Sequence, residues 1–256
     1  MARLEVTTLQ GIPEVRAGDD LAALILQSLS ANGIAPADGD VVALAQKIVS
    51  KAEDRFVRLA DVTPSARAQD YAAQTGKDAR LIEVILEESR EVLRARPGLI
   101  IVEDRRGLVL ANAGIDASNV PGSDEDTVLL LPVDPDASAA RLRAALEAQT
   151  GRRLAVIILD SIGRAWRQGT VGTAIGSAGL PALLDLRGNA DRVGRTLIAT
   201  EIGLADEIAA AASLLIGQAA EGTPVALLRG VPSAYMATPE GRAADIQRPR
   251  QMDLFR

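Results

Sequence analysis

The sequence predicts an α+β fold with mixed or antiparallel sheets, and two observations carry this prediction. Apolar stretches of strand length intermix with stretches of helical spacing, but they lack the strict strand–helix–strand rhythm of a doubly wound parallel sheet. With 48% hydrophobic residues among 256, the chain can also build a large core. No repeat or long linker divides it, so we expect one functional unit over residues 1–237 and a polar, loosely held tail over residues 238–256.

Three helices are predicted in the first part of the chain. Residues 19–33 begin with acidic residues suited to a cap and stop at Gly33. Residues 63–76 have Pro64 where a first helical turn tolerates it, and residues 78–98 form an amphipathic pattern that ends at Pro97-Gly98. Residues 39–59, between the first two helices, are expected to be rich in β-structure.

Strands dominate the prediction from residue 99 onward. Residues 99–116 indicate a hairpin, and residues 127–134 form a strand that leads through Asp134 and Asp136, as capping residues, into a helix over 137–151. Residues 152–160 are the most buried-looking strand. Glycines between positions 163 and 194 indicate close backbone approaches. A helix over 203–223 and a last strand over 224–230 complete the prediction.

Composition excludes several classes of function. The chain has no cysteine and no histidine, so disulfides, Cys/His zinc sites and a Ser-His-Asp triad are all ruled out. A net charge of -6 and 2% aromatic residues argue against a nucleic-acid partner. No apolar stretch has the length of a signal peptide or a membrane span, so we expect a cytoplasmic protein with small-molecule partners and no membrane contact.

Two lysines are the first candidate binding residues. Lys47 and Lys51, two of only three lysines, are four residues apart, and on an extended strand they project from one face beside Gln46. Two ammonium groups on one face suit an oligophosphate, although a solvated strand face is the alternative. No Walker signature accompanies them. Gly217 and Gly222 bracket a helix end that either approaches phosphates or simply stops the helix.

Carboxylates at strand ends are the second candidate. Asp116 and Asp160 each follow an apolar strand, and Ser161 places a hydroxyl oxygen beside the second of them. Such oxygens suit Mg²⁺ or Mn²⁺, whereas a turn or cap is the alternative role for each acid taken singly. Arg164 follows closely and could clamp anionic substrate oxygens. The lone Trp166 could stack on a heteroaromatic ring or belong to the core.

Several motifs together resemble one known family. They are "GIPEV" (11–15), "AQKIVSKAE" (45–53), "ANAGIDASNV" (111–120), "LLPVDPDASA" (130–139), "DSIGRAWRQGTVGTAIG" (160–176), "GLADEIAAAASLLIGQAAEG" (203–222) and "PVALLRG" (224–230). In this order they resemble the coenzyme F420-0:γ-glutamyl ligases, GTP-dependent enzymes that add glutamate to the deazaflavin coenzyme F420. The likeness covers nearly the whole chain except the C-terminal tail.

The resemblance implies a set of site residues. Those that contact GTP would be Ile12, Pro13, Glu14, Val15, Gln46, Lys47, Lys51, Asn119, Ile216, Gly217, Gln218, Ala219, Ala220, Glu221, Gly222 and Thr223. Those that hold two divalent cations, Mg²⁺ or Mn²⁺, with K⁺ as a further ion, would be Asp116, Asp160, Ser161 and Gln218. Asp116, Asp160 and Arg164 would be the catalytic residues.

The resemblance also implies an architecture and a reaction. The family fold is an intermixed α+β subunit with two subdomains, paired into an interlocked homodimer. GTP would phosphorylate the carboxylate of F420-0, and the amine of L-glutamate would then displace phosphate. Two departures from the family pattern, Arg106 and Ala165, fall outside the nucleotide and metal positions. The alternatives are a glutamate ligase acting on another acid, such as a folate, and a non-catalytic nucleotide-binding module.

Overall fold

A mixed five-stranded sheet lies at the centre of the computed structural model, which describes residues 3–116, 126–236 and 239–253. Its order is β1-β12-β2-β8-β9, formed by β1 (Glu5–Thr8), β12 (Val225–Arg229), β2 (Val41–Ala45), β8 (Ala155–Gly163) and β9 (Thr170–Ala178). β2 and β8 run parallel, and the other neighbouring pairs are antiparallel. The predicted α+β class with a mixed sheet is therefore confirmed.

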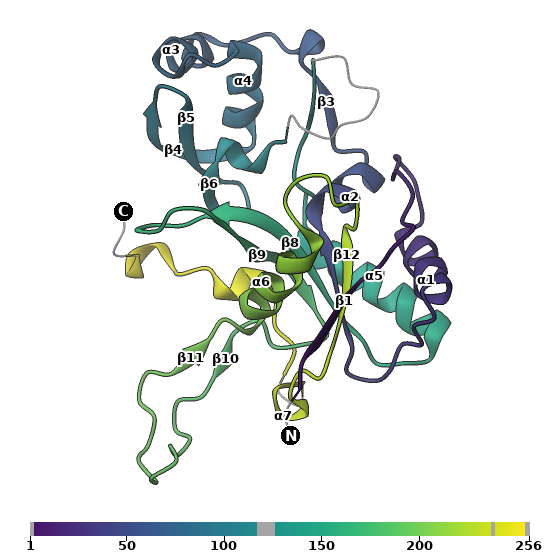
Figure 1. Cartoon of the computed structure of the whole chain (residues 1–256). Coiled ribbons are helices and arrows are strands. Elements are labelled where there is room, and N and C mark those ends of the chain that lie inside the picture. The colour runs from purple at the N-terminus through teal and green to yellow at the C-terminus, as the bar shows by residue number, and fades with distance from the viewer. Residues whose placement is uncertain (1–2, 117–125, 237–238, 254–256) are drawn as a thin grey trace.

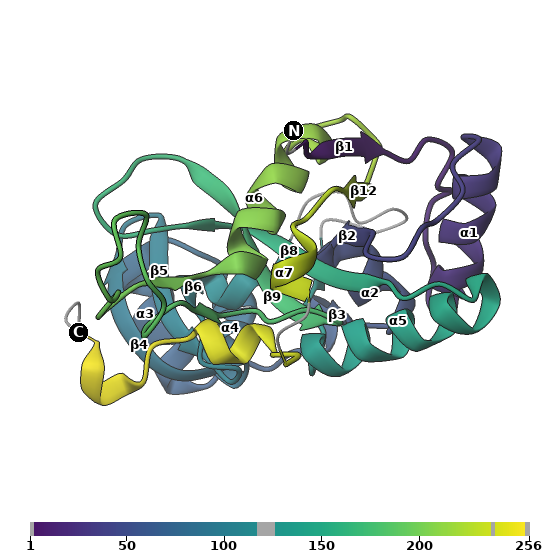
Figure 2. The same ribbon diagram turned by 90° about the horizontal axis from the view of Figure 1, so that it is seen from below.

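Helices cover both faces of this sheet (Figures 1 and 2). α1 (Leu21–Ala31) and α5 (Pro135–Thr150) pack on one face, and α6 (Leu204–Ile216) packs on the other. Alternate residues of β2 belong to different cores, because successive side chains of a strand point to opposite faces. Val42 and Leu44 join the core under α1 and α5, whereas Val41 and Ala43 join the core under α6.

A smaller sheet with its own core lies beside the central one. It contains β4 (Ser89–Arg96), β5 (Leu99–Asp104) and β6 (Val109–Ala111), and it packs against α3 (Ala66–Thr75) and α4 (Ala79–Glu87). The predicted hairpin over 99–116 is confirmed. The predicted helix over 78–98 is wrong beyond Glu87, because residues 89–96 pair along β5 and turn at Gly98 with a φ of 79°. Pairing with a later strand outweighs the local helical pattern here.

The remaining elements are short. β3 (Phe56–Arg58) pairs with β7 (Thr127–Leu129), and β10 (Leu184–Asp185) pairs with β11 (Glu201–Ile202). The segment between β10 and β11 extends away from the body of the molecule (Figure 1). The short helices are α2 (Gln46–Ala52), α7 (Ser233–Met236), η1 (Leu59–Asp61), η2 (Asn112–Gly114), η3 (Ala243–Ile246) and η4 (Arg250–Met252). Within the described ranges, every helix is too short or too polar to cross a membrane.

Close backbone approaches occur at some of the predicted glycines. A Cβ atom on Gly172 would lie 2.4 Å from the Cβ of Ser213 in α6, and one on Gly176 would lie 2.4 Å from the carbonyl oxygen of Pro135 in α5. β9 is thus held tightly between helices on both faces. The prediction is wrong for four other glycines, which face open space: Gly163, Gly169, Gly188 and Gly194.

The C-terminal tail is bound to the body of the molecule over its described part. Asp136 accepts hydrogen bonds from the amides of Ala243 and Ala244, at 2.8 and 3.2 Å, and from Ser177 in β9 at 2.9 Å. Glu240 pairs with Arg143 of α5 at 2.7 Å. The expectation of a loosely held tail therefore does not describe residues 240–244, which these contacts hold against the body. Asp134 caps α5, whereas Asp136 serves as this anchor.

Candidate active site

The two candidate lysines lie on a helix rather than on a strand. The chain passes directly from β2 into α2 at Gln46, so the strand predicted for this segment is wrong after Ala45. Residues four apart share one face of a helix just as they share one face of a strand. Lys47 and Lys51 therefore remain on one side, at the carboxyl end of a central strand.

Lys51 is buried and already paired. Its Nζ donates a hydrogen bond of 2.5 Å to Glu14, which lies in the segment between β1 and α1. Its side chain is only 8% exposed, whereas that of Glu14 is 54% exposed. Glu14 thus holds Lys51 in place. Because Glu14 is itself half exposed, its carboxylate can turn into solvent and leave the lysine free to bind an anion.

Asp116 is the acid that α2 holds in place. Gln46 donates from Nε2 to the carboxylate at 2.9 Å, and the Nζ of Lys47 lies 3.4 Å from Oδ1. Ser50 donates to Oε1 of Gln46 at 2.8 Å, which fixes the orientation of the amide. Burial raises the pKa of Asp116, and the charge of Lys47 opposes that rise.

Asp160 lies close enough to Asp116 for the two charges to interact. Burial raises the pKa of Asp160 to about 6, the backbone amide of Ser161 opposes that rise, and the negative charge of Asp116 adds to it. β8 does not end at Asp160 as predicted but continues to Gly163, pairing with β9. Asp116 lies after η2, in an isolated bridge to Leu129 of β7, whereas Asp160 lies in the central sheet. The charge of Lys47 acts on both carboxylates.

A loop after α6 forms the opposite side of the site. Gln218 lies in this loop, and its Oε1 accepts a hydrogen bond from the hydroxyl of Ser161. The side chains of Asp116, Asp160, Ser161 and Gln218 together supply oxygen donors, the type that hard divalent cations prefer. Among the described residues, no group of three or more Asp, Glu, His or Cys residues could hold a metal ion, so carboxylates alone do not complete a site here.

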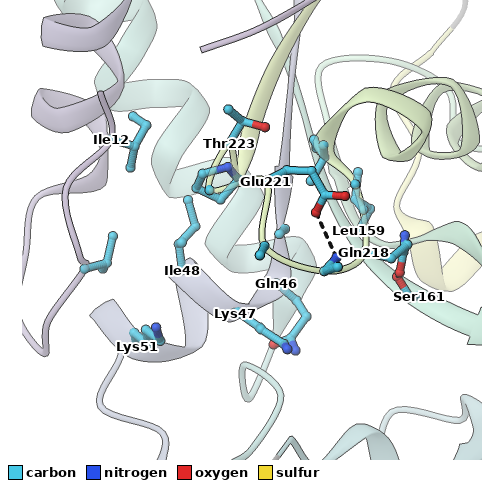
Figure 3. Close-up of a pocket in the computed structure, with 18 of the residues that line it drawn as sticks. Ile12, Gln46, Lys47, Ile48, Lys51, Leu159, Ser161, Gln218, Glu221 and Thr223 are labelled. Atoms are coloured by element: carbon cyan, nitrogen blue, oxygen red, sulfur yellow. Dashed lines mark hydrogen bonds between the residues drawn. The ribbon is translucent and has the colours of Figure 1, made fainter. Parts of the chain in front are cut away.

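One cavity of about 650 Å³ joins these groups (Figure 3). This volume lies in the range of sites for small molecules and cofactors, about 300 to 1,000 Å³. The predicted nucleotide and metal residues that line it are Ile12, Pro13, Glu14, Val15, Gln46, Lys47, Lys51, Asp160, Ser161, Ile216, Gly217, Gln218, Ala219, Ala220, Glu221, Gly222 and Thr223. Asp116 is reached through Gln46 and Lys47. Asn119 lies outside the described residues.

Arg164 lies in a second cavity, of about 1,410 Å³. It follows β8 and donates to the carbonyl oxygen of Gly169 at 3.1 Å, and it does not line the first cavity. The second cavity lies between the β4-β5-β6 sheet, the β8–β9 hairpin, the start of α6 and the C-terminal tail. Sequence reasoning missed it, apart from singling out Arg164. Trp166 is 87% exposed, so it does not belong to the core.

The second cavity combines an apolar wall with charged groups. Leu99, Ile101 and Leu108 contribute to the wall. The charged residues that line it are Arg94, Arg96, Arg164, Arg167, Arg250, Glu91, Asp206, Glu207 and Asp253.

Comparison with known proteins connects this geometry to a family. The model of the F420-0:γ-glutamyl ligase family matches residues 11–230, which include every residue that lines the first cavity. The chain belongs to this family. It is 46% identical to the coenzyme F420:L-glutamate ligase of Methanothermobacter thermautotrophicus over 97% of both chains. It is 43% identical to the protein of the same name from Methanopyrus kandleri, over 100% of both chains. It is also 43% identical to the one from Archaeoglobus fulgidus, over 99% of this chain and 97% of the relative.

The two departures from the usual F420-0:γ-glutamyl ligase pattern lie away from the first cavity. Arg106 is largely covered between Asp104 and Glu88, where it donates to both carboxylates. Ala165 lines the second cavity beside Arg164. Neither residue is among those lining the 650 Å³ cavity.

Proposed function

We propose that the protein is a GTP-dependent ligase that adds L-glutamate to coenzyme F420-0, and then further γ-linked glutamates, with release of GDP and phosphate. The observation that carries this proposal is the first cavity, in which three distant segments with the predicted nucleotide residues meet Asp160. Asp116, whose charge acts on Asp160, lies behind Gln46 and Lys47. The names of the relatives supply the acceptor and the amino acid.

The first cavity suits a nucleoside triphosphate. Lys47 and Lys51 are cations on one face of α2, and ammonium groups offset the negative charge of phosphate oxygens. Glu14 can release Lys51 to a phosphate, because its own carboxylate is half exposed. The apolar side chains of Ile12 and Ile48 provide a surface for a nucleobase.

Two divalent cations fit the donor set beside the lysines. Asp116, Asp160, Ser161 and Gln218 would hold them, and the mutual repulsion of the two carboxylates favours a cation between them. Bound Mg²⁺ or Mn²⁺ would supply charge neutralisation for the phosphates during transfer.

The second cavity suits the acceptor. Residues 159–161 of β8 line the first cavity, and the next residues of the chain, 162–164, line the second. The acceptor carboxylate can therefore meet the γ-phosphate close to Asp160. Arginines in the second cavity suit a phosphodiester and carboxylates, and its apolar wall suits an aromatic ring system.

Amide formation then follows in two displacements. An oxygen of the acceptor carboxylate attacks the γ-phosphorus, and the bond to the β–γ bridging oxygen breaks to release GDP. The amine of L-glutamate attacks the acyl carbon, loses a proton, and expels phosphate together with that carboxylate oxygen. No protein nucleophile is required, which suits a chain without cysteine or histidine. Arg164 would orient the acceptor rather than the nucleotide.

We also propose that the protein acts as a homodimer. Val193 and Ile198 are 71% and 86% exposed on the segment that extends between β10 and β11 (Figure 1). A second subunit that covers this projecting segment would remove both apolar side chains from water.

One experiment separates this function from its alternatives. The protein is incubated with GTP, Mn²⁺, L-glutamate and F420-0, and products are followed by mass spectrometry and by GDP release. Stepwise addition of glutamate supports the proposal. Glutamate-dependent GDP release only with another acid, such as a folate, would favour a glutamate ligase that acts on that acid. No GDP release with any acceptor would favour a nucleotide-binding module.

A further inference from the structure

Glu221 differs in its surroundings from the other carboxylates that line the first cavity. Glu14 pairs with Lys51, and Asp160 lies beside Asp116 and Lys47. Glu221, in contrast, accepts a hydrogen bond of 2.8 Å from the backbone amide of Ala219. Among the described residues, the groups that lower its pKa are backbone amides rather than lysines or arginines.

The loop after α6 fixes the position of this carboxylate. Gly217 has a φ of 81°, and a Cβ atom there would lie 2.1 Å from the carboxyl carbon of Glu221. The side chain therefore folds over a glycine that leaves space for it. Figure 3 shows Glu221 and Gln218 on the loop that borders the cavity, with Ile12 and Ile48 among the other residues that line it. A carboxylate oxygen can accept more than one hydrogen bond, so the bond to Ala219 leaves acceptor capacity for a ligand.

Charge decides which part of a nucleotide suits this carboxylate. The phosphates belong near Lys47 and Lys51, because an unneutralised carboxylate repels them. The base belongs at the apolar surface of Ile12 and Ile48. Guanine presents two adjacent donors, N1–H and the N2 amino group, which one carboxylate can accept together. Adenine presents a lone pair at N1, which repels a carboxylate.

We propose that Glu221 selects guanine over adenine by accepting hydrogen bonds from N1–H and N2–H of the base. This inference rests on the proposed function, which supplies a nucleotide in the first cavity. It adds the residue that selects which base that nucleotide carries. A site built to bond a donor discriminates against a ligand that lacks it, because the bound base covers the exposed carboxylate of Glu221 and a wrong base leaves that carboxylate without a partner.

The test is direct binding by calorimetry to the purified full chain in the presence of Mn²⁺. The wild type is expected to prefer GDP to ADP by at least about 100-fold, and Glu221→Gln to reduce that ratio by about 10- to 100-fold. Glu14→Gln is the matched control: it removes the charge of another carboxylate that lines the cavity, releases Lys51 to the phosphates that both nucleotides share, and keeps the ratio. Thermal unfolding checks that each variant is folded.

Inosine diphosphate, which lacks the 2-amino group, provides a second readout on folded wild-type protein. We expect it to bind the wild type about 10-fold more weakly than GDP, and to bind Glu221→Gln with little difference from GDP. Equal loss of GDP and ADP binding in Glu221→Gln would overturn the proposal in favour of a ribose contact or a loop-stabilising role. Tighter binding of both would overturn it in favour of competition with phosphate.

Measuring both binding and turnover distinguishes a failure of the ligase function from a failure of the role proposed for Glu221. Selective binding of GDP without any glutamylated product would contradict the ligase function and leave the role of Glu221 intact. Glutamylated product with equal use of GTP and ATP would contradict the role of Glu221 and leave the ligase function intact.

Discussion

The carboxyl group of Asp160 is buried, and burial disfavours its ionised form. Burial raises its pKa from 3.8 to about 6, so the folded state binds a proton more tightly than the unfolded state. The ionised form therefore lowers stability, and this cost grows as the pH rises from about 4 to about 6 in the absence of metal. The same ionised form is the one that would bind a cation.

Asp160→Asn should therefore separate stability from activity. At pH 7 without metal, urea unfolding should show the variant at least as stable as the wild type, and the difference should shrink toward pH 4. Glutamylation should fall by at least about 100-fold, because an amide replaces an anionic metal ligand. A variant that is less stable at pH 7, or that keeps wild-type turnover, would contradict the assigned role.

Arg106 lies in a buried ionic network between β5 and β6. It donates to Asp104 at 2.7 Å, to Glu88 at 3.1 Å and to the carbonyl oxygen of Pro132 at 3.0 Å. Its side chain is 12% exposed, and that of Asp104 is fully buried. The network joins α4, the β5–β6 hairpin and the segment before α5.

Arg106→Ala should destabilise the protein by about 3–5 kcal/mol, because it leaves the buried carboxylate of Asp104 without its cation, whereas Glu88 keeps Arg55. The measurement is the free energy of urea unfolding. Arg58→Ala is the control, since Arg58 and Asp61 form an exposed pair at 3.9 Å, and it should cause little change. Equal effects of the two substitutions would contradict the assignment of a structural network.

At the scale of elements, the contact of β9 with α6 positions the loop that carries Gln218 and Glu221. Gly172→Ala should push α6 away, because the added Cβ would lie 2.6 Å from the carbonyl oxygen of Ala209 as well as against Ser213. Overpacking of this kind costs about 1–3 kcal/mol. We expect a lower melting temperature and weaker nucleotide binding.

Gly163→Ala, in the strand paired with β9, is the matched control. No heavy atom lies within 4 Å of the Cβ position at Gly163, and its φ is not in the left-handed region. It should leave the melting temperature and nucleotide binding nearly unchanged. If both glycine variants behaved alike, contact with α6 would not be what positions the loop.

Elements with local signals could be predicted from the sequence. Asp20, Ser65 and Asp134 cap α1, α3 and α5 through their own side chains, and α6 ends at Gly217. α2 and β4 could not be predicted in the same way. The apolar residues of α2 resemble a strand, and β4 forms only because β5 follows at the right distance to pair with it.

The residues of the first cavity could be predicted from motifs, because each stretch of chain that lines it contains a motif of its own. The second cavity was not, since it requires β4, the β8–β9 hairpin, α6 and the tail to meet in space. Arg164 illustrates the limit. Its spacing from Asp160 indicated a shared site, but the continuation of β8 takes it to the neighbouring cavity.

At the scale of the whole molecule, the exposed apolar residues between β10 and β11 bear on assembly. Sedimentation should give twice the 26.8 kDa of one chain. Ile198→Asp should shift the protein toward the monomer, because a charge replaces an apolar side chain in the covered surface. Val133→Asp, at a residue 66% exposed before α5, should leave the dimer intact. A monomeric wild type would contradict the proposed homodimer.

In the reaction that we propose, one site between two cavities that share β8 joins GTP to an acceptor carboxylate. This reaction is tested most directly with F420-0 labelled with ¹⁸O in the carboxylate that receives glutamate, together with GTP, Mn²⁺ and L-glutamate. When limiting L-glutamate restricts the reaction to the first addition, we expect one ¹⁸O atom in each phosphate released and one glutamate in each product, both measured by mass spectrometry. Glutamylated product with unlabelled phosphate, or no product with this acceptor, would contradict it.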